Sequence, residues 1–265
     1  MTDLKEIARS IEEIAREAGN FIKNEALTFD IKDAESKGVN NFVSYVDKGA
    51  EKIIVDRLSK LLPDSAFMTE EGTVKKEEKR YCWVVDPLDG TTNFLHGLPP
   101  YAVSIGLMDN DEVIAGVIYE IRGDELFTAW KDGGSWLNGK RIRVSDAATL
   151  SDSLVATGFP YTDFSRIENY MDCFTWFCKH SHGVRRLGSA ATDIAYIACG
   201  RFEVFYEYGL HPWDIAAGII ILREAGGKIT DFSGNGNNLD GSEIVAATNK
   251  VYDETLGIVR KFMKS

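Results

Sequence analysis

Two acidic side chains follow a short apolar run in the first half of the chain. Residues 83–85 are apolar and β-rich, which is typical of a strand buried on both faces, and we expect this strand to end at Asp86-Pro87. Asp89 follows three residues after Asp86. Two carboxylates this close at the end of a buried strand would repel each other and raise a pKa. A hard divalent cation such as Mg²⁺, which takes oxygen ligands, removes that repulsion.

The residues after Asp89 suit a tight turn that opens into a helix. They are Gly90, Thr91, Thr92 and Asn93. The free N–H groups of the first three would point outward from a helix start and form a site for a phosphate oxyanion. A cation on one side and an anion cradle on the other indicate phosphate ester hydrolysis. Taken alone, the same residues are equally typical of an ordinary strand-to-helix turn.

Other acids stand in the same setting, directly after a β-rich or apolar run. Glu70 follows residues 65–69, and Glu207 follows residues 202–206. Asp214 instead begins a strongly apolar helix, where a carboxylate also complements the helix dipole without any further role. Because ligands of α/β proteins gather at the carboxyl ends of strands, we expect these acids to converge there.

Hydrophobic periodicity predicts alternating helices and strands. Apolar residues at i, i+3 and i+4 predict an amphipathic helix over 3–26. We expect a strand at 27–31, a mobile surface loop at 33–41 and a helix or turn at 91–97. Further helices are expected at 47–62, 163–180, 189–198, 214–225 and 252–263. Strands are expected at 65–69, 83–85, 101–108, 113–121, 126–130, 153–157, 202–206, 228–230 and 244–247.

This order of elements predicts a layered α/β sandwich. The strands from 101 to 130 alternate with turns, as in an antiparallel meander, and Asn138-Gly139 is a hairpin signal. No linker separates independent units, so we expect a single domain over 1–265. Its N-terminal half, about 1–150, carries Glu70 and the Asp86–Asp89 pair, and its C-terminal half, about 151–265, carries Asp214.

Composition narrows the class of protein. The chain has 265 residues, of which 44% are hydrophobic, enough for a dense core. A formal net charge of −11 argues against direct binding to nucleic acid or to an anionic membrane. The four cysteines form no C-x-x-C pair, which favours a reducing compartment. The first residues contain no signal-peptide pattern, and the longest apolar run is too short to cross a bilayer, so we expect a cytoplasmic protein.

Three separated motifs together resemble the inositol monophosphatase family. They are DPLDGTTNF (86–94), the Glu70-Glu71-Gly72 turn, and WDIAAGIIILREAGG (213–227). The similarity runs through essentially the whole chain, including RRLGSAATDIAYIACGRFEVFYE (185–207), and is nearest to the bacterial extragenic-suppressor type. The resemblance implies an αβαβα sandwich, usually dimeric, and an enzyme that Li⁺ often inhibits.

The resemblance also implies two or three Mg²⁺ ions per active site. Glu70, Asp86 and the carbonyl group of Leu88 would hold the first ion. Asp86, Asp89 and Asp214 would hold the second. A third, weaker ion would rely on Glu70 and water.

Catalytic and substrate contacts are implied in the same way. Thr91 and Asp47 would orient and deprotonate the attacking water, and the amides of Gly90 and Thr91 would bind phosphate. Glu207 and Ala190 would contact the hydroxyl-bearing part of the substrate. The expected catalytic set is Asp47, Glu70 and Thr91, and the expected substrate-binding set is Asp89, Gly90, Thr91, Thr92, Ala190, Glu207 and Asp214.

The leading functional hypothesis is Mg²⁺-dependent hydrolysis of a small phosphate monoester, with myo-inositol 1-phosphate as the first candidate. A fructose-1,6-bisphosphatase or a broader sugar phosphatase is the alternative within the same chemistry. Relatives that cleave nucleotide 3′-phosphates or histidinol phosphate tend to carry Lys or Arg where Thr92 stands, which disfavours both. An alternative of another class is a protein that binds RNA polymerase in antitermination complexes, as the resemblance to bacterial relatives implies.

Overall fold

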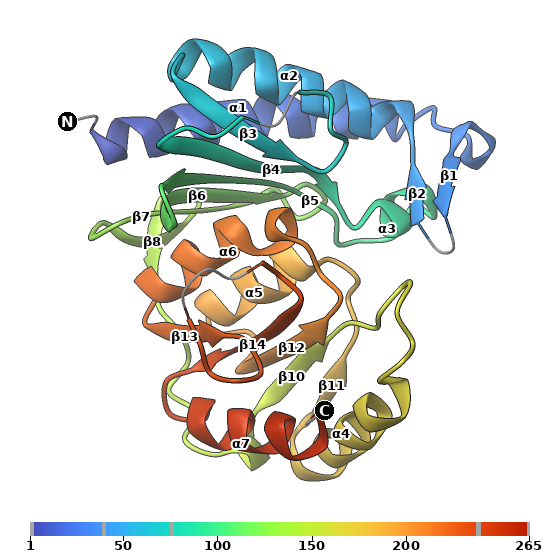
Figure 1. Cartoon of the computed structure of the whole chain (residues 1–265), viewed down its shortest axis with the longest axis vertical. Coiled ribbons are helices and arrows are strands. Elements are labelled where there is room, and N and C mark those ends of the chain that lie inside the picture. Colours follow the sequence, from blue (N-terminus) through green and yellow to red (C-terminus); the bar gives the residue numbers. More distant parts are fainter. Residues whose placement is uncertain (1–2, 39–40, 75–76, 237–239, 264–265) are drawn as a thin grey trace.

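Two long helices form the first layer of the protein. The computed structural model describes residues 3–38, 41–74, 77–236 and 240–263, and Figure 1 shows five stacked layers of helix and sheet. Helices α1 (Leu4–Glu25) and α2 (Tyr45–Leu61) cover the outer face of the first sheet. The apolar stripe predicted for α1 is buried there, and the Asp3 side chain caps the helix by accepting a hydrogen bond from the Lys5 N–H.

The first sheet has seven strands that follow one another in chain order. Strands β3 and β4 are parallel, and every later neighbour is antiparallel, as the predicted meander requires. The Asn138-Gly139 turn joins the last two strands. The strands are β3 (Ser65–Thr69), β4 (Tyr81–Asp89), β5 (Ala102–Asp109), β6 (Glu112–Glu120), β7 (Glu125–Trp130), β8 (Gly134–Leu137) and β9 (Lys140–Ile142).

Two apolar helices fill the space between the two sheets. They are α5 (Ala190–Ala198) and α6 (Pro212–Glu224), and both lie under the first sheet in Figure 1. A Cβ atom on Gly116 of β6 would lie only 2.9 Å from the Cα of Ala217, so glycine lets α6 approach the sheet closely. This close packing is what holds the start of α6 near the end of β4.

The second sheet and two further helices complete the stack. Its strand order is β11-β10-β12-β14-β13, and α4 (Ile167–His180) and α7 (Tyr252–Met263) cover its outer face. The architecture is an αβαβα sandwich, so the predicted fold class is confirmed. The strands are β10 (Leu154–Thr157), β11 (Gly183–Arg185), β12 (Val204–Tyr208), β13 (Gly227–Thr230) and β14 (Glu243–Thr248).

Two predictions between α1 and α2 are wrong. No strand forms at 27–31, because the N–H groups of Leu27, Thr28 and Phe29 donate back to the carbonyl groups at the end of α1. A 3-10 helix follows at Ile31–Asp33. The expected loop at 33–41 contains β1 (Glu35–Gly38) and the start of β2 (Asn41–Val43), which pair antiparallel, while residues 39–40 lie outside the described residues.

Two further differences concern strands. Sequence reasoning missed β11, a three-residue strand at the edge of the sheet that pairs with β10. It also ended the central strand at Asp86-Pro87, whereas β4 continues to Asp89 and α3 (Thr91–Leu95) begins just beyond it. Within the described part of the chain, no helix is long and apolar enough to span a bilayer.

Candidate metal and phosphate site

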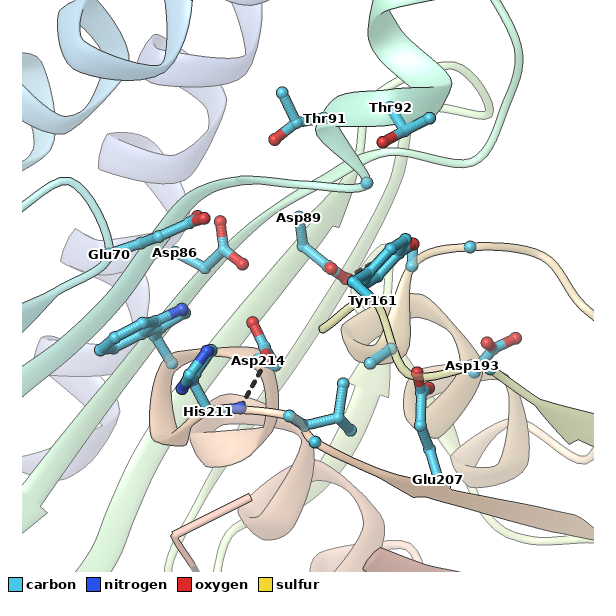
Figure 2. A pocket seen from close by; sticks show the side chains of 18 of the residues that line it. Glu70, Asp86, Asp89, Thr91, Thr92, Tyr161, Asp193, Glu207, His211 and Asp214 are labelled. Carbon is cyan, nitrogen blue, oxygen red and sulfur yellow. Dashed lines mark hydrogen bonds between the residues drawn. The ribbon is translucent and has the colours of Figure 1, made fainter. Parts of the chain in front are cut away.

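The parallel pairing of β3 and β4 brings the first two acids together. Thr69 lies opposite Val85, and the Glu70 N–H donates to the Val85 carbonyl oxygen at 3.2 Å. One step further along both strands, Glu70 is next to Asp86. Figure 2 shows their carboxylates facing each other across this strand end. The predicted convergence of acids therefore begins with strand register.

A bulge in β4 turns Asp89 to the same side as Asp86. Residues three apart on a regular strand point to opposite faces. Here Asp86 pairs with Ser104 and Asp89 pairs with Ala102, so three steps on β4 match two on β5. The extra residue reverses the alternation, so both carboxylates come within reach of Asp214 at the start of α6.

The start of α6 supplies the third acid of the cluster. The Ser104 hydroxyl group donates to the Trp213 carbonyl oxygen at 3.4 Å, which links β5 to the first turn of this helix. Asp214, the next residue, lies opposite the two acids of β4 (Figure 2). One carboxylate oxygen from each of Asp86, Asp89 and Asp214 lies within 4.8 Å of the other two.

Asp214 is also a helix cap. Its Oδ2 atom accepts a hydrogen bond from the His211 N–H at 2.7 Å, and the His211 ring stacks on Trp213 with 4.8 Å between ring centres. The capping interpretation and the site interpretation are therefore both satisfied by one side chain. The cap fixes the orientation of the carboxylate group, and the same side chain lines the pocket.

Asp89 is held in place by the start of α5. Its Oδ2 atom accepts hydrogen bonds from the Ser189 hydroxyl group at 2.5 Å and from the Ala191 N–H at 2.8 Å. The Gly90 amide also faces this carboxylate, so it is not simply free for an anion as the sequence suggested. These donors orient Asp89 and offset part of the free-energy cost of burying its charge.

Burial and mutual repulsion make the charged form of these acids unfavourable without a cation. Burial raises the pKa of Asp86 well above its usual value, and the charges of Glu70, Asp89 and Asp214 raise it further. Burial also raises the pKa of Asp214, with Asp89 as the next cause. The pKa of Asp89 rises to about 6, mainly because of burial and against the Ser189 hydrogen bond.

A divalent cation fits this donor set. The cluster offers hard, anionic oxygen atoms, which Mg²⁺ and similar ions prefer, and a bound cation would reverse the repulsion that raises the pKa values. Glu70 lies beside the cluster and interacts electrostatically with Asp86 and Asp214. The physical case for a metal site is thus the crowding itself.

Thr91 and Asp47 form a second polar unit next to the acids. Thr91 Oγ1 lies 3.0 Å from Asp47 Oδ1 and 2.9 Å from the Leu88 carbonyl oxygen, so its single proton can go to either. Asp47 Oδ2 accepts the Ser44 N–H at 2.8 Å and the Ser44 hydroxyl group at 2.6 Å. Burial raises the pKa of Asp47 and these hydrogen bonds oppose the rise.

Gly90 makes the turn between β4 and α3. Its φ is +88°, and a Cβ atom there would lie 2.9 Å from the Pro100 carbonyl oxygen, so this position requires glycine. The turn brings Thr91 and Thr92 to the pocket wall.

All but one of the predicted site residues line a single cavity of about 150 Å³. The exception is Asp47, which hydrogen-bonds Thr91 without lining the cavity itself. Figure 2 shows Glu70, Asp86 and Asp214 at one end and Glu207 at the other. The predicted residues on the wall are Glu70, Asp86, Leu88, Asp89, Gly90, Thr91, Thr92, Ala190, Glu207 and Asp214.

Comparison with known proteins agrees with this geometry. The sequence pattern of the inositol monophosphatase family matches residues 3–264. The chain belongs to the inositol monophosphatase family. Among relatives of this family member, an inositol-1-monophosphatase of Mesorhizobium japonicum is 43% identical over 226 residues, covering 85% of each chain.

Two other relatives carry a different kind of name. The Nus factor SuhB of Escherichia coli is 42% identical to this inositol monophosphatase family member over 93% of the chain and 92% of its own length. The solved structure of the extragenic suppressor protein suhB from Bartonella henselae has a TM-score of 0.90 at 37% identity, covering 96% of this chain and 98% of that one.

Sequence reasoning missed one acid that lines the pocket. Asp193 lines the cavity at the Glu207 end and is 1% exposed. Its Oδ1 atom has no hydrogen-bond partner within the described residues, and burial raises the pKa of the side chain well above its usual value. Asp193 lies in the GSAATD stretch (188–193), but the neighbouring residues give no sign that its side chain faces the pocket.

The raised pKa values predict the pH dependence of the metal-free protein. A folded-state pKa above the unfolded value gives most stability at low pH, and this stability is lost as pH rises through the folded pKa. Asp89 has a folded pKa of about 6. The free energy of unfolding is measured with urea in the presence of a chelator. As pH rises from about 4 to 7, we expect this free energy to increase for Asp89→Asn relative to the wild type by on the order of 2 kcal/mol.

Asp109→Asn is the matched control for that measurement. The hydrogen bond from Arg80 lowers the pKa of Asp109, so the ionised Asp109 stabilises the fold as pH rises. Asp109→Asn should therefore gain no stability relative to the wild type over this pH range. A wild type that becomes more stable than Asp89→Asn over the same range would contradict the raised pKa of Asp89.

Proposed function

We propose that this chain is a Mg²⁺-dependent phosphatase of small phosphate monoesters, with myo-inositol 1-phosphate as its first candidate substrate. One observation carries the proposal. Three carboxylate oxygens from Asp86, Asp89 and Asp214 lie within 4.8 Å of one another, and Thr91 and Asp47 form a hydrogen-bonded pair beside them. Membership of the inositol monophosphatase family supports the same reaction class.

The proposed ligands follow from position in the pocket. Glu70, Asp86 and the Leu88 carbonyl group would hold one Mg²⁺, and Asp86, Asp89 and Asp214 a second. When bound, Mg²⁺ would neutralise the charge of the phosphate ester and lower the pKa of a water molecule. Even when the Leu88 carbonyl oxygen accepts the Thr91 hydroxyl group, it has a second lone pair available, and both are available when Thr91 donates to Asp47.

The polar pair would act on the attacking water. When the Thr91 hydroxyl group donates to Asp47, its own oxygen can accept a proton from water in the pocket. Asp47 is buried and held by Ser44, so the pair is oriented before substrate arrives. A raised pKa makes Asp47 a better acceptor of the proton that Thr91 passes on.

The far end of the pocket would receive the alcohol part of the substrate. Glu207 lines the cavity there, away from Glu70, Asp86 and Asp214. Ala190 lines the same cavity with its backbone near Asp89. A carboxylate in that place can accept hydrogen bonds from hydroxyl groups, which favours a polyol over an apolar alcohol. The homodimer, inhibition by Li⁺, the third Mg²⁺ and the cytoplasmic location stay predictions.

Phosphate release from a panel of esters tests the proposed function. We expect turnover of myo-inositol 1-phosphate with Mg²⁺ and none with a chelator. Asp214→Asn should lower kcat/KM by at least about 100-fold, because it removes one ligand and its charge from the site. A preference for fructose 1,6-bisphosphate would favour the sugar phosphatase alternative, and equal turnover in Asp214→Asn would contradict the assignment of this ligand.

Thr91→Val serves as the control that separates chemistry from metal binding. It keeps all the acids, so Mg²⁺ should still raise the melting temperature as it does in the wild type. Its kcat should fall, because the water loses its hydrogen-bond acceptor.

A second candidate function is a protein-binding role in transcription. The observation that favours it is the 42% identity to a protein named Nus factor SuhB in Escherichia coli. Asp89→Asn separates the two candidates. If the variant loses phosphatase activity and still complements a growth phenotype of cells that lack the protein, the binding role is favoured; parallel loss of both favours catalysis.

A further inference from the structure

Glu51 is a buried carboxylate on α2 that the mechanism above does not use. Its side chain is 0% exposed, and its two oxygens accept four hydrogen bonds. Oε1 accepts the Thr69 hydroxyl group at 2.9 Å, the Thr73 N–H at 2.9 Å and the Thr73 hydroxyl group at 2.5 Å. Oε2 accepts the Glu71 N–H at 2.9 Å. None of these donors is a basic side chain.

All four donors belong to the short segment that carries Glu70. On one side, the Glu70 N–H is paired with the Val85 carbonyl oxygen of β4. On the other side, Glu71 and Thr73 are tied to α2 through Glu51. The segment is therefore fastened to the sheet and to the helix at once, and the direction of the Glu70 side chain depends on both attachments.

The same face of α2 also carries Asp47, which pairs with Thr91. Asp47 precedes Glu51 by four residues, about one helical turn, so both side chains lie on one buried face of the helix. Asp47 accepts the Thr91 hydroxyl group, and Glu51 holds the Glu70 turn. One helix thereby fixes the relative positions of Thr91 and Glu70.

We propose that Glu51 is the positioning residue for the Mg²⁺ that Glu70 binds. This inference rests on the proposed function, because it takes Glu70 as a metal ligand. Partners behind a metal ligand orient it, and their loss typically costs about 10- to 100-fold in metal affinity. Removal of Glu51 should accordingly weaken the Glu70-dependent Mg²⁺ and leave the ion at Asp86, Asp89 and Asp214 in place.

Glu51→Gln is the direct test. The amide keeps the size of the side chain and one acceptor oxygen, but its NH₂ group must face one of the N–H or O–H donors. Titration calorimetry should show that Glu51→Gln binds Mg²⁺ at that site with an affinity at least about 10-fold lower than the wild type. Glu70→Gln is the reference that lacks this ion. Amide hydrogen exchange without metal should be faster at Glu71 and Thr73.

Glu120→Gln is the matched control. Glu120 is also buried, at 2% exposure, and it accepts the Arg122 and Gly123 N–H groups in the turn between β6 and β7 without lining the pocket. It should lose stability and keep the wild-type affinity for Mg²⁺. If Glu51→Gln does not fold, Thr73→Val, which removes one donor of the four, should show a smaller loss of affinity in the same direction.

The outcomes separate this inference from the proposed function. Weaker Mg²⁺ binding in Glu51→Gln, with normal binding in Glu120→Gln, supports the positioning role. Wild-type affinity in Glu51→Gln, or equal weakening in both variants, overturns it and leaves the phosphatase proposal standing. A wild-type protein that binds no Mg²⁺ overturns both, even if exchange at Glu71 and Thr73 changes as expected.

Discussion

Negative charge confined at the end of β4 is the constraint on which the rest of the structure depends. Asp86 and Asp89 are 2% and 9% exposed, and Asp214 lies next to them on α6, in the adjacent helical layer. Each carboxylate disfavours ionisation of the others, and hydrogen bonds relieve only part of this repulsion. Such an arrangement would lower the stability of the metal-free protein, and a bound cation would turn the same groups into ligands.

The five layers serve to bring these groups together from distant parts of the chain. The parallel pairing of β3 and β4 places Glu70 beside Asp86, and the bulge in β4 turns Asp89 to the same side. The close packing of α6 on the first sheet then adds Asp214. Each contribution comes from an ordinary structural feature, so the chemistry depends on their common meeting point rather than on any one motif.

Much of this could be predicted from the sequence, because most of the signals were local. Apolar periodicity located the helices, and acids at the ends of β-rich runs indicated the site. The bulge at Asp86–Asp89 could not be predicted, since it depends on pairing with β5. The burial of Glu51 was missed for a similar reason. An acid on a helix is usually exposed to solvent, and the sequence does not show that residues 69–73 pack against Glu51. The polar composition of 33–41 likewise concealed the pairing of β1 with β2.

The most direct measurement is anomalous diffraction from crystals of the wild-type protein soaked with Mn²⁺, an electron-rich substitute for Mg²⁺ that also takes oxygen ligands. Our account predicts a strong peak between the carboxylates of Asp86, Asp89 and Asp214, and its absence in crystals of Asp214→Asn. Strong peaks confined to other parts of the surface, with this cluster empty at saturating Mn²⁺, would contradict the claim that the acids are gathered to bind a cation.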